Sequence, residues 1–324
     1  MNLHTNHQLF QDAVIATAQR FNIPEIYIEK DYWVTVALHA VFNSPAAENT
    51  VFKGGTALSK CHKLINRFSE DVDLLVHAKN GESKSQLKNK LKAITDAVIK
   101  VMPEIEIVGV TNKRGMIRKT AHQYNKQQFN GSYGQVREQI IIEASWLGSS
   151  EPYIIAEISC YITDMMKATF QNQMIEQYML MPFPVKVLSK ERTLCEKIMS
   201  LVRFSFTEVP YEDLANKIRH IYDLHLLLKN EEVDGFFKSS DFQTLLLQVG
   251  KEDMMSFKNN KGWLQNHPST AIIFSSPEDT WNRIRRTYRT SFKDLVIGNL
   301  PEESELLNTL DNIYKRLEQI KWIL

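Results

Sequence analysis

Asp71 and Asp73 stand two residues apart at the start of an apolar run, Asp-Val-Asp-Leu-Leu-Val. A carboxylate in an apolar run costs desolvation free energy, so two of them need a purpose. In a strand the side-chain period is two, which would direct both carboxylates to one face, roughly 6.5–7 Å apart. Carboxylates at that spacing can share divalent cations, and Mg²⁺ is bound through one or two carboxylates, water and substrate phosphate oxygens. We therefore predict that Asp71 and Asp73 are ligands of Mg²⁺.

Gly54 and Gly55 follow a short apolar run and precede a segment with a helical pattern, sixteen residues before Asp71. A strand, a glycine turn and a helix start would present free backbone N–H groups to a phosphate. Glycine allows close approach of the backbone, and Thr56 would add a hydroxyl donor. Either feature alone fits an ordinary loop or an edge strand. Together they predict a metal–phosphate site, in which a pair of ions could activate an attacking oxygen and hold leaving pyrophosphate.

The motifs that carry these residues resemble a known superfamily. KGGTALSK followed by RFSEDVDL is similar to the nucleotidyltransferase superfamily, whose fold resembles the palm of DNA polymerase beta. Three further segments narrow the resemblance to the AbiEii/AbiGii toxin family over residues 28–228: IEKDYWV at 28–34, RTLCEKI at 192–198 and RHIYDL at 219–224.

This resemblance implies a Mg-dependent nucleotidyltransferase that transfers NMP from an NTP to a hydroxyl acceptor. The implied acceptor is RNA, with a tRNA end as one candidate. The implied biological role is that of a toxin in a toxin–antitoxin and phage-defence system, with a cognate antitoxin encoded nearby. A small-molecule acceptor and a non-catalytic nucleotide-binding regulatory protein are the alternative readings.

The resemblance also implies a third carboxylate on a neighbouring strand, as a metal ligand or general base. Glu143, in QIIIEASW, is the first choice, and Glu157, in the equally apolar IIAEISCY, is the rival. Lys197 matches a functional lysine of the family and would neutralise triphosphate charge, although by composition it is an ordinary helix lysine. Asp223 matches a family aspartate that could orient Lys197 or contact the nucleotide.

Three charged segments have a less definite role. Residues 29–31, Glu-Lys-Asp, interrupt an apolar helix and could brace the glycine turn. Residues 113–126 and 281–289 interleave basic and aromatic side chains, a pattern that suits RNA phosphates and unstacked bases. Both could equally be solvated faces, since Trp281, Ile284 and Tyr288 fall at the spacing of a core stripe.

The elements that must position these residues follow from hydrophobic periodicity. The seam is expected near residues 182–189, and up to it we predict helices and strands in alternation. The strands are expected at residues 51–52, 71–76, 105–110, 118–124, 136–146, 154–162 and 185–188. From Glu191 onward we predict helices at 191–204, 211–229, 241–249, 278–296 and 302–323. The expected fold is α/β (α+β), with a nucleotidyltransferase domain with a mixed sheet over residues 1–188 and a helical domain over 189–324 that contributes to nucleotide and acceptor binding.

Composition bounds the remaining possibilities. The net charge of +1 provides no global attraction to nucleic acid or membrane, so any basic binding face must be local. Three widely separated cysteines make a disulfide framework or a zinc site unexpected. We find no signal-peptide pattern and no apolar run of about 18 residues, and therefore expect a cytoplasmic protein without membrane contact.

Overall fold

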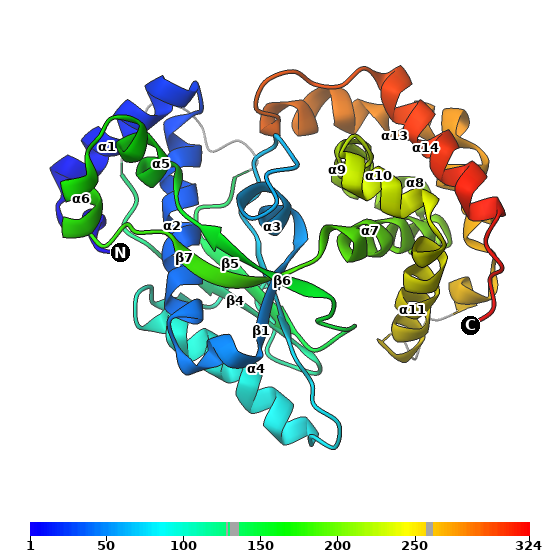
Figure 1. Ribbon diagram of the computed structural model, residues 1–324, viewed down its shortest axis with the longest axis horizontal. Helices are drawn as coiled ribbons and strands as arrows, with labels where there is room; N and C mark the ends of the chain where they lie inside the picture. The colour runs from blue at the N-terminus through cyan, green and yellow to red at the C-terminus, as the bar shows by residue number, and fades with distance from the viewer. Residues whose placement is uncertain (128, 130–135, 257–261) are drawn as a thin grey trace. The chain divides into compact units, whose positions relative to one another are not determined.

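The computed structural model describes residues 1–127, 129, 136–256 and 262–324, and the chain divides into two compact units (Figure 1). Unit 1 comprises Met1–His62, Phe68–Trp146 and Tyr153–Val187. Unit 2 comprises Lys63–Arg67, Leu147–Pro152 and Leu188–Leu324. The sheet belongs to unit 1, and helices dominate unit 2, which confirms the predicted α+β class. Among the described helices, none combines the length and the apolar character that a membrane span requires.

Unit 1 is built on a seven-stranded mixed sheet with the strand order β3-β4-β5-β2-β1-β7-β6. The strands are β1 (Thr50–Lys53), β2 (Val72–Val76), β3 (Glu104–Ile105), β4 (Ile117–His122), β5 (Ile140–Ser145), β6 (Tyr153–Ile158) and β7 (Phe183–Leu188). Strand β2 lies at the centre, antiparallel to β1 and parallel to β5. The strand expected over 105–110 is shorter than predicted, because the chain turns back at Ile107, whose carbonyl accepts bonds from Val110 and Thr111.

The described residues of unit 1 also form six α-helices (Figure 1). They are α1 (His7–Phe21), α2 (Glu25–Phe42), α3 (Gly54–Lys60), α4 (Lys84–Ile99), α5 (Tyr161–Ala168) and α6 (Asn172–Gln177). Of these, α2, α3 and α4 contact strands of the sheet, and α1, α5 and α6 pack on other helices. Helix α4 begins with a capping box, in which Ser83 accepts from the Gln86 N–H and Gln86 accepts from the Ser83 N–H. It packs against β2, β4 and β5 on one face of the sheet.

Helix α2 is buried on nearly all sides, from Ile26 to Val41. An apolar helix of this kind belongs in a core rather than at a surface. It nevertheless carries Glu29, Lys30 and Asp31, all buried. Charged groups in such a place must have partners, because an unpaired buried charge is strongly unfavourable.

Unit 2 contains the remaining helices of the described chain. They are α7 (Lys190–Ser205), α8 (Pro210–Asn216), α9 (Ile218–Leu228), α10 (Glu231–Lys238), α11 (Ser240–Ser256), α12 (Ile272–Ser275), α13 (Pro277–Thr287) and α14 (Glu303–Glu318). The single helix expected over 211–229 is two helices, which break at Lys217, where φ is −105° and ψ is 14°. The predicted core stripe of α13 and the following turn is buried, with Trp281, Ile284 and Tyr288 at 1–2% exposure.

Candidate active site

The glycine turn between β1 and α3 touches a predicted metal ligand. Gly54 has φ +83°, a conformation that side chains rarely adopt. A Cβ added to Gly54 would lie 2.2 Å from Oδ2 of Asp73, so the backbone reaches this carboxylate only because there is no side chain. The sequence predicted that the glycine turn and Asp73 belong to one site, and in the structure the two are in contact.

Asp71, Asp73 and Glu143 form a row of carboxylates, which we call the carboxylate row. The parallel pairing of β2 and β5 places Asp73 opposite Glu143. Burial, followed by the negative charges of Asp71 and Glu143, raises the pKa of Asp73 to about 7, as expected where like charges are close. Asp73 therefore lies beside Gly54, and the charges of Asp71 and Glu143 act on it.

The carboxylate row lies on the sheet face opposite helix α4. Arg118 donates from Nε to the Thr95 hydroxyl of α4, so it points to the α4 face. Lys119 is the next residue of β4 and pairs in register with Glu143, so both point to the other face. The rival residue, Glu157, lies on the edge strand β6, which β1 and β7 separate from β2. The structure therefore brings Glu143, and not Glu157, beside Asp73.

The two outer members of the carboxylate row, Asp71 and Glu143, each form an ion pair with a basic side chain. Arg137 Nη1 lies 2.7 Å from Oδ1 of Asp71, and Lys119 Nζ lies 3.0 Å from Oε2 of Glu143. Lys119 is the one residue of the basic segment 113–126 shown here to bind the row. Elsewhere in that segment Lys113 pairs with Glu104, and Lys126 pairs with Glu138.

The donor set of the carboxylate row fits Mg²⁺. Carboxylate oxygens are the ligands that this ion prefers. Burial is the main cause of the raised pKa of Asp73, and the charges of Asp71 and Glu143 add to it, so a cation at the row would stabilise the ionised carboxylate. In the described part of the chain, no three histidine, cysteine or carboxylate side chains are already gathered as a metal-binding group. Metal binding would therefore draw Asp71 and Glu143 closer to Asp73, in competition with the cations that they now bind.

Thr56 is buried and its hydroxyl is engaged within the fold. It donates to the main-chain carbonyl of Asp71 at 2.6 Å and lies 3.0 Å from the Ser69 hydroxyl. These bonds join the start of α3 to the segment that enters β2. In this arrangement Thr56 fixes the backbone of Asp71, which is a different task from the predicted donation to a phosphate.

Lys30 of α2 fixes the segment that carries Arg137. Its ammonium group is fully buried and donates to the carbonyls of Arg137 and Gln139, the latter at 2.6 Å. It also pairs with Glu70 at 3.3 Å. Burial lowers the pKa of Lys30, and the neighbouring carboxylates of Glu70 and Asp71 oppose that shift.

Glu29 and Asp31 hold other segments of unit 1. Asp31 pairs with Lys60 at the end of α3 and accepts the Tyr161 N–H at 2.8 Å. Glu29 accepts the Gln127 N–H at 2.7 Å, and burial raises its pKa to about 7. The charged run of α2 thus ties together the chain around the site, and through Lys60 it anchors the helix that follows the glycine turn.

Lys197 and Asp223 of unit 2 form a buried ion pair that also includes Arg67. Lys197 Nζ lies 2.7 Å from Oδ2 of Asp223, and Arg67 donates to both carboxylate oxygens, at 2.7 and 2.8 Å. Asp223 is fully buried, and burial alone would raise its pKa. Arg67 and Lys197 outweigh burial and hold the pKa of this carboxyl well below its usual range. Of the two roles considered for Asp223, this geometry favours orienting Lys197.

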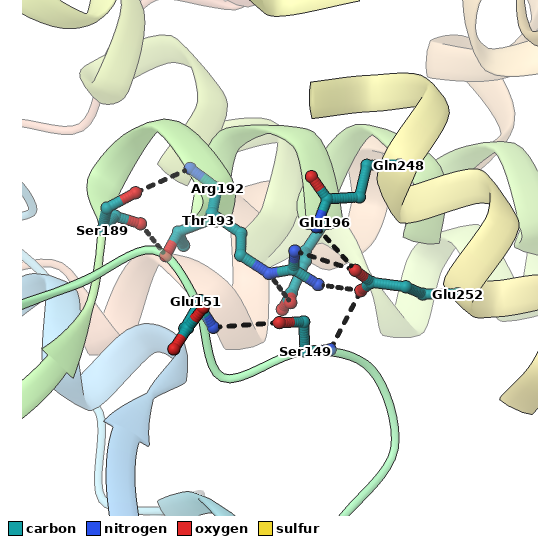
Figure 2. A network of polar contacts seen from close by, with 8 residues as sticks. All are labelled: Ser149, Glu151, Ser189, Arg192, Thr193, Glu196, Gln248 and Glu252. Atoms are coloured by element: carbon teal, nitrogen blue, oxygen red, sulfur yellow. Dashed lines mark hydrogen bonds and ion pairs between the residues drawn. The ribbon is translucent and has the colours of Figure 1, made fainter. Parts of the chain in front are cut away.

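A second polar network fixes the helix that carries Lys197 (Figure 2). Arg192 of α7 is buried and binds Glu196 at 3.1 Å and Glu252 of α11. Glu252 also accepts the Ser149 N–H at 2.9 Å, and Ser189 caps α7 by accepting the Arg192 N–H. The network joins α7, α11 and residues 147–152 within unit 2.

Several residues of these networks were missed from the sequence. Arg67 stands in the RFSEDVDL motif, four residues before Asp71, and its position in a charged motif was the available signal. Arg137 lies outside every motif and carried no signal. Lys119 lay within a basic segment whose overall charge concealed its individual role.

A carboxylate row on a central strand, touched by a glycine turn at a helix start, is the arrangement of a nucleotidyltransferase site. The family model for the "Nucleotidyl transferase AbiEii toxin, Type IV TA system" matches residues 37–316. The chain belongs to this family and is a nucleotidyltransferase toxin of the type IV toxin–antitoxin class. The predicted resemblance is therefore confirmed.

Among solved structures, the chain is similar to MenT4, a nucleotidyltransferase toxin from Mycobacterium tuberculosis H37Rv, with 14% sequence identity and a TM-score of 0.41. The similarity covers 98% of this chain and 96% of that chain. No curated protein matches the sequence.

Replacing Gly54 with alanine tests the contact with Asp73. The new Cβ would force the Asp73 carboxylate to rotate away, so we expect G54A to lose nucleotidyl transfer, measured as pyrophosphate release from γ-labelled NTP in cell extract. G81A is the matched control, because Gly81 has φ +85° and open space around it. Both variants should lose about 1 kcal/mol from backbone strain, measured by urea unfolding. Full transfer activity in G54A would contradict the assigned contact.

Replacing Asp223 with asparagine tests the buried ion pair. Because D223N leaves Arg67 and Lys197 buried without their carboxylate, we expect a loss of about 3–5 kcal/mol in unfolding free energy at pH 7. D96N is the control, since it breaks an exposed pair with Lys92 and should cost less than about 1 kcal/mol.

The same pair gives an expected pH dependence. The pKa of Asp223 is depressed in the folded protein, so its stabilisation is complete above the unfolded-state pKa of about 3.9 and is lost as pH falls through the folded-state value. The difference in unfolding free energy between wild type and D223N should therefore stay constant from pH 8 to 5 and shrink below about pH 4. A difference that grows in acid would show that Asp223 is not held ionised.

Proposed function

We propose that this toxin transfers NMP from an NTP to a hydroxyl group of an RNA acceptor, with Mg²⁺ held by Asp71, Asp73 and Glu143. The observation that carries the proposal is the contact of Gly54 with Asp73 in the middle of the carboxylate row. It joins a backbone turn suited to phosphate with oxygen ligands suited to a divalent cation. The backbone N–H groups of the turn formed by Gly54, Gly55 and Thr56 would receive the phosphates, because the Thr56 hydroxyl is engaged with the Asp71 carbonyl.

The proposed reaction forms one bond and breaks one. The acceptor oxygen bonds to the α-phosphorus, and the bond from that phosphorus to the β-phosphate oxygen breaks, which releases pyrophosphate. Bound Mg²⁺ would supply charge stabilisation for the phosphoryl group during this exchange. In this proposal Glu143, the member of the row on β5, orients the acceptor hydroxyl or accepts its proton.

Lys197 is proposed as a nucleotide-binding residue of unit 2. Asp223 accepts from both Lys197 and Arg67, so the buried group carries two positive charges and one negative charge. The excess positive charge suits a polyphosphate. Asp223 then acts by fixing the position of the Lys197 ammonium group rather than by touching the nucleotide.

An RNA acceptor is favoured by a basic and aromatic surface on unit 2. Arg283 of α13 stacks on the Tyr211 ring of α8 at 4.5 Å. Arg203 and Lys217 both approach the Phe204 ring, at 4.7 and 4.8 Å. Cationic groups can serve as partners for phosphates, and aromatic rings can serve as stacking surfaces for unpaired bases. A tRNA end, which is single-stranded, is one acceptor of this chemistry.

Type IV family membership implies an antitoxin partner. Its encoding beside this gene, a role in phage defence and a cytoplasmic location remain predictions. The predicted cytoplasmic location would give the protein access to NTPs and RNA, the proposed substrates. Growth arrest on induced expression, relieved by a neighbouring small gene, would support the toxin role.

Replacing Asp73 with asparagine tests the proposed chemistry. D73N keeps the size of the side chain and removes its charge, so we expect transfer of label from α-labelled NTP to total RNA to fall by at least about 10³-fold. E157Q is the control, because Glu157 lies on the distant edge strand β6, and it should retain activity. Each of the four NTPs should be tried, followed by sizing of the labelled species.

The outcomes distinguish the competing functions. Label in RNA that is lost with D73N supports the proposal. Label confined to a small-molecule fraction would indicate a small-molecule acceptor. NTP binding without pyrophosphate release, in extract that contains both kinds of acceptor, would indicate a non-catalytic protein.

Reversing charge on α13 tests the RNA surface. The double variant R283E/R286E should weaken RNA binding and reduce the slope of log affinity against log salt by about one per lost phosphate contact. K315E, on the exposed face of α14, is the matched control and should leave the slope unchanged. An unchanged slope in the double variant would place RNA elsewhere on the protein.

A further inference from the structure

Asp71 and Glu143, the outer members of the carboxylate row, pair with basic side chains that are more exposed than the basic side chains of the buried networks. The side chains of Lys30, Arg67 and Arg192 are at most 3% exposed, and each joins several segments of the fold. Lys119 is 30% exposed and Arg137 is 45% exposed. Exposed pairs contribute little to stability, so Lys119 and Arg137 can leave Glu143 and Asp71 without unfolding the protein.

Arg137 combines a backbone held by hydrogen bonds with a side chain that is 45% exposed. Its N–H donates to Oε1 of Glu70 at 3.0 Å, and its carbonyl accepts from the buried Lys30 ammonium group. The single side-chain contact that the structure describes for it is the 2.7 Å bond to Asp71. A guanidinium group on an anchored backbone can change partners while remaining beside the carboxylate row.

Lys119 has the same relation to Glu143. Its backbone is fixed in the β4–β5 ladder and by reciprocal bonds with Asn112, while its side chain extends along the face of the row. The row is thus flanked by one cation on each outer carboxylate. Both flanking cations sit where a polyphosphate beside the row would need positive charge.

We propose that Lys119 and Arg137 are triphosphate-binding residues that hold Glu143 and Asp71 in the metal-free protein and pass to the nucleotide when these carboxylates bind divalent cations. This inference rests on the proposed function. Bound divalent cations would supply the positive charge that Asp71 and Glu143 need, so Arg137 and Lys119 would be free to bind the anionic oxygens of the triphosphate. Arginine suits this exchange because its planar fork matches phosphate as well as carboxylate oxygens.

The proposal requires two affinities to change in opposite directions. In R137Q and in K119Q, the affinity for Mn²⁺ without nucleotide should increase by about threefold to tenfold, because a competing cation is removed. The affinity for an α,β-methylene NTP in the presence of Mg²⁺ should decrease by about tenfold, because a phosphate partner is removed. The first is measured by electron paramagnetic resonance of free Mn²⁺, and the second by calorimetry with each of the four nucleotide analogues.

K92Q is the matched control, because it removes the same charge from an exposed pair on α4 and should change neither affinity. R137K separates charge from shape: it should keep the Mn²⁺ affinity of wild type and recover only part of the nucleotide affinity. Loss of both affinities in R137Q and K119Q would indicate a structural role and overturn the proposal. Unchanged nucleotide affinity would also overturn it, whichever way the Mn²⁺ affinity moves.

The same measurements distinguish failure of this inference from failure of the proposed metal-dependent nucleotidyl transfer. If wild type binds neither Mn²⁺ nor any of the four analogues, the metal-dependent function fails, and this inference fails with it. If wild type binds both while R137Q and K119Q behave like K92Q, the function stands and the inference alone is wrong.

Discussion

The burial of Asp73 beside two further carboxylates, Asp71 and Glu143, is the constraint on which the site of unit 1 depends. Burial, followed by the negative charges of Asp71 and Glu143, raises the pKa of Asp73 to about 7, and the surrounding chain must compensate for this charge. The pairing of β2 with β5 brings the carboxylates together, and the pairing of β5 with β4 places Lys119 beside Glu143, where it compensates part of their negative charge. The site is therefore held in a state that favours the arrival of cations.

Rigidity around the site comes from charges buried in an otherwise apolar helix. Glu29, Lys30 and Asp31 of α2 each bind a different segment, so one helix sets the positions of several pieces of chain. Breaking any of these bonds would leave an uncompensated buried charge, which is costlier than losing an apolar contact. The arrangement keeps the backbone around the row fixed while the side chains that face it remain partly exposed.

Unit 2 uses buried arginines in a similar way. Arg67 shares Asp223 with Lys197, and Arg192 joins α7 to α11 through Glu252 (Figure 2). Arg67 groups with unit 2 although it lies only four residues before Asp71 of unit 1. A short stretch of chain thus contributes to the ion pair of one unit and to the carboxylate row of the other.

The sequence by itself determined the local features: the α+β class, the glycine turn, the same-face placement of Asp71 and Asp73, and the family. These follow from backbone preference, side-chain period and motif spacing, which depend on near neighbours along the chain. Only the tertiary structure shows that Glu143, and not Glu157, lies beside Asp73. It also shows that the Thr56 hydroxyl binds the Asp71 carbonyl, that Arg67 pairs with Asp223, and that Arg137 pairs with Asp71. Strand order and long-range ion pairs join residues far apart in sequence, and no periodicity in the chain records which strand becomes the neighbour of another.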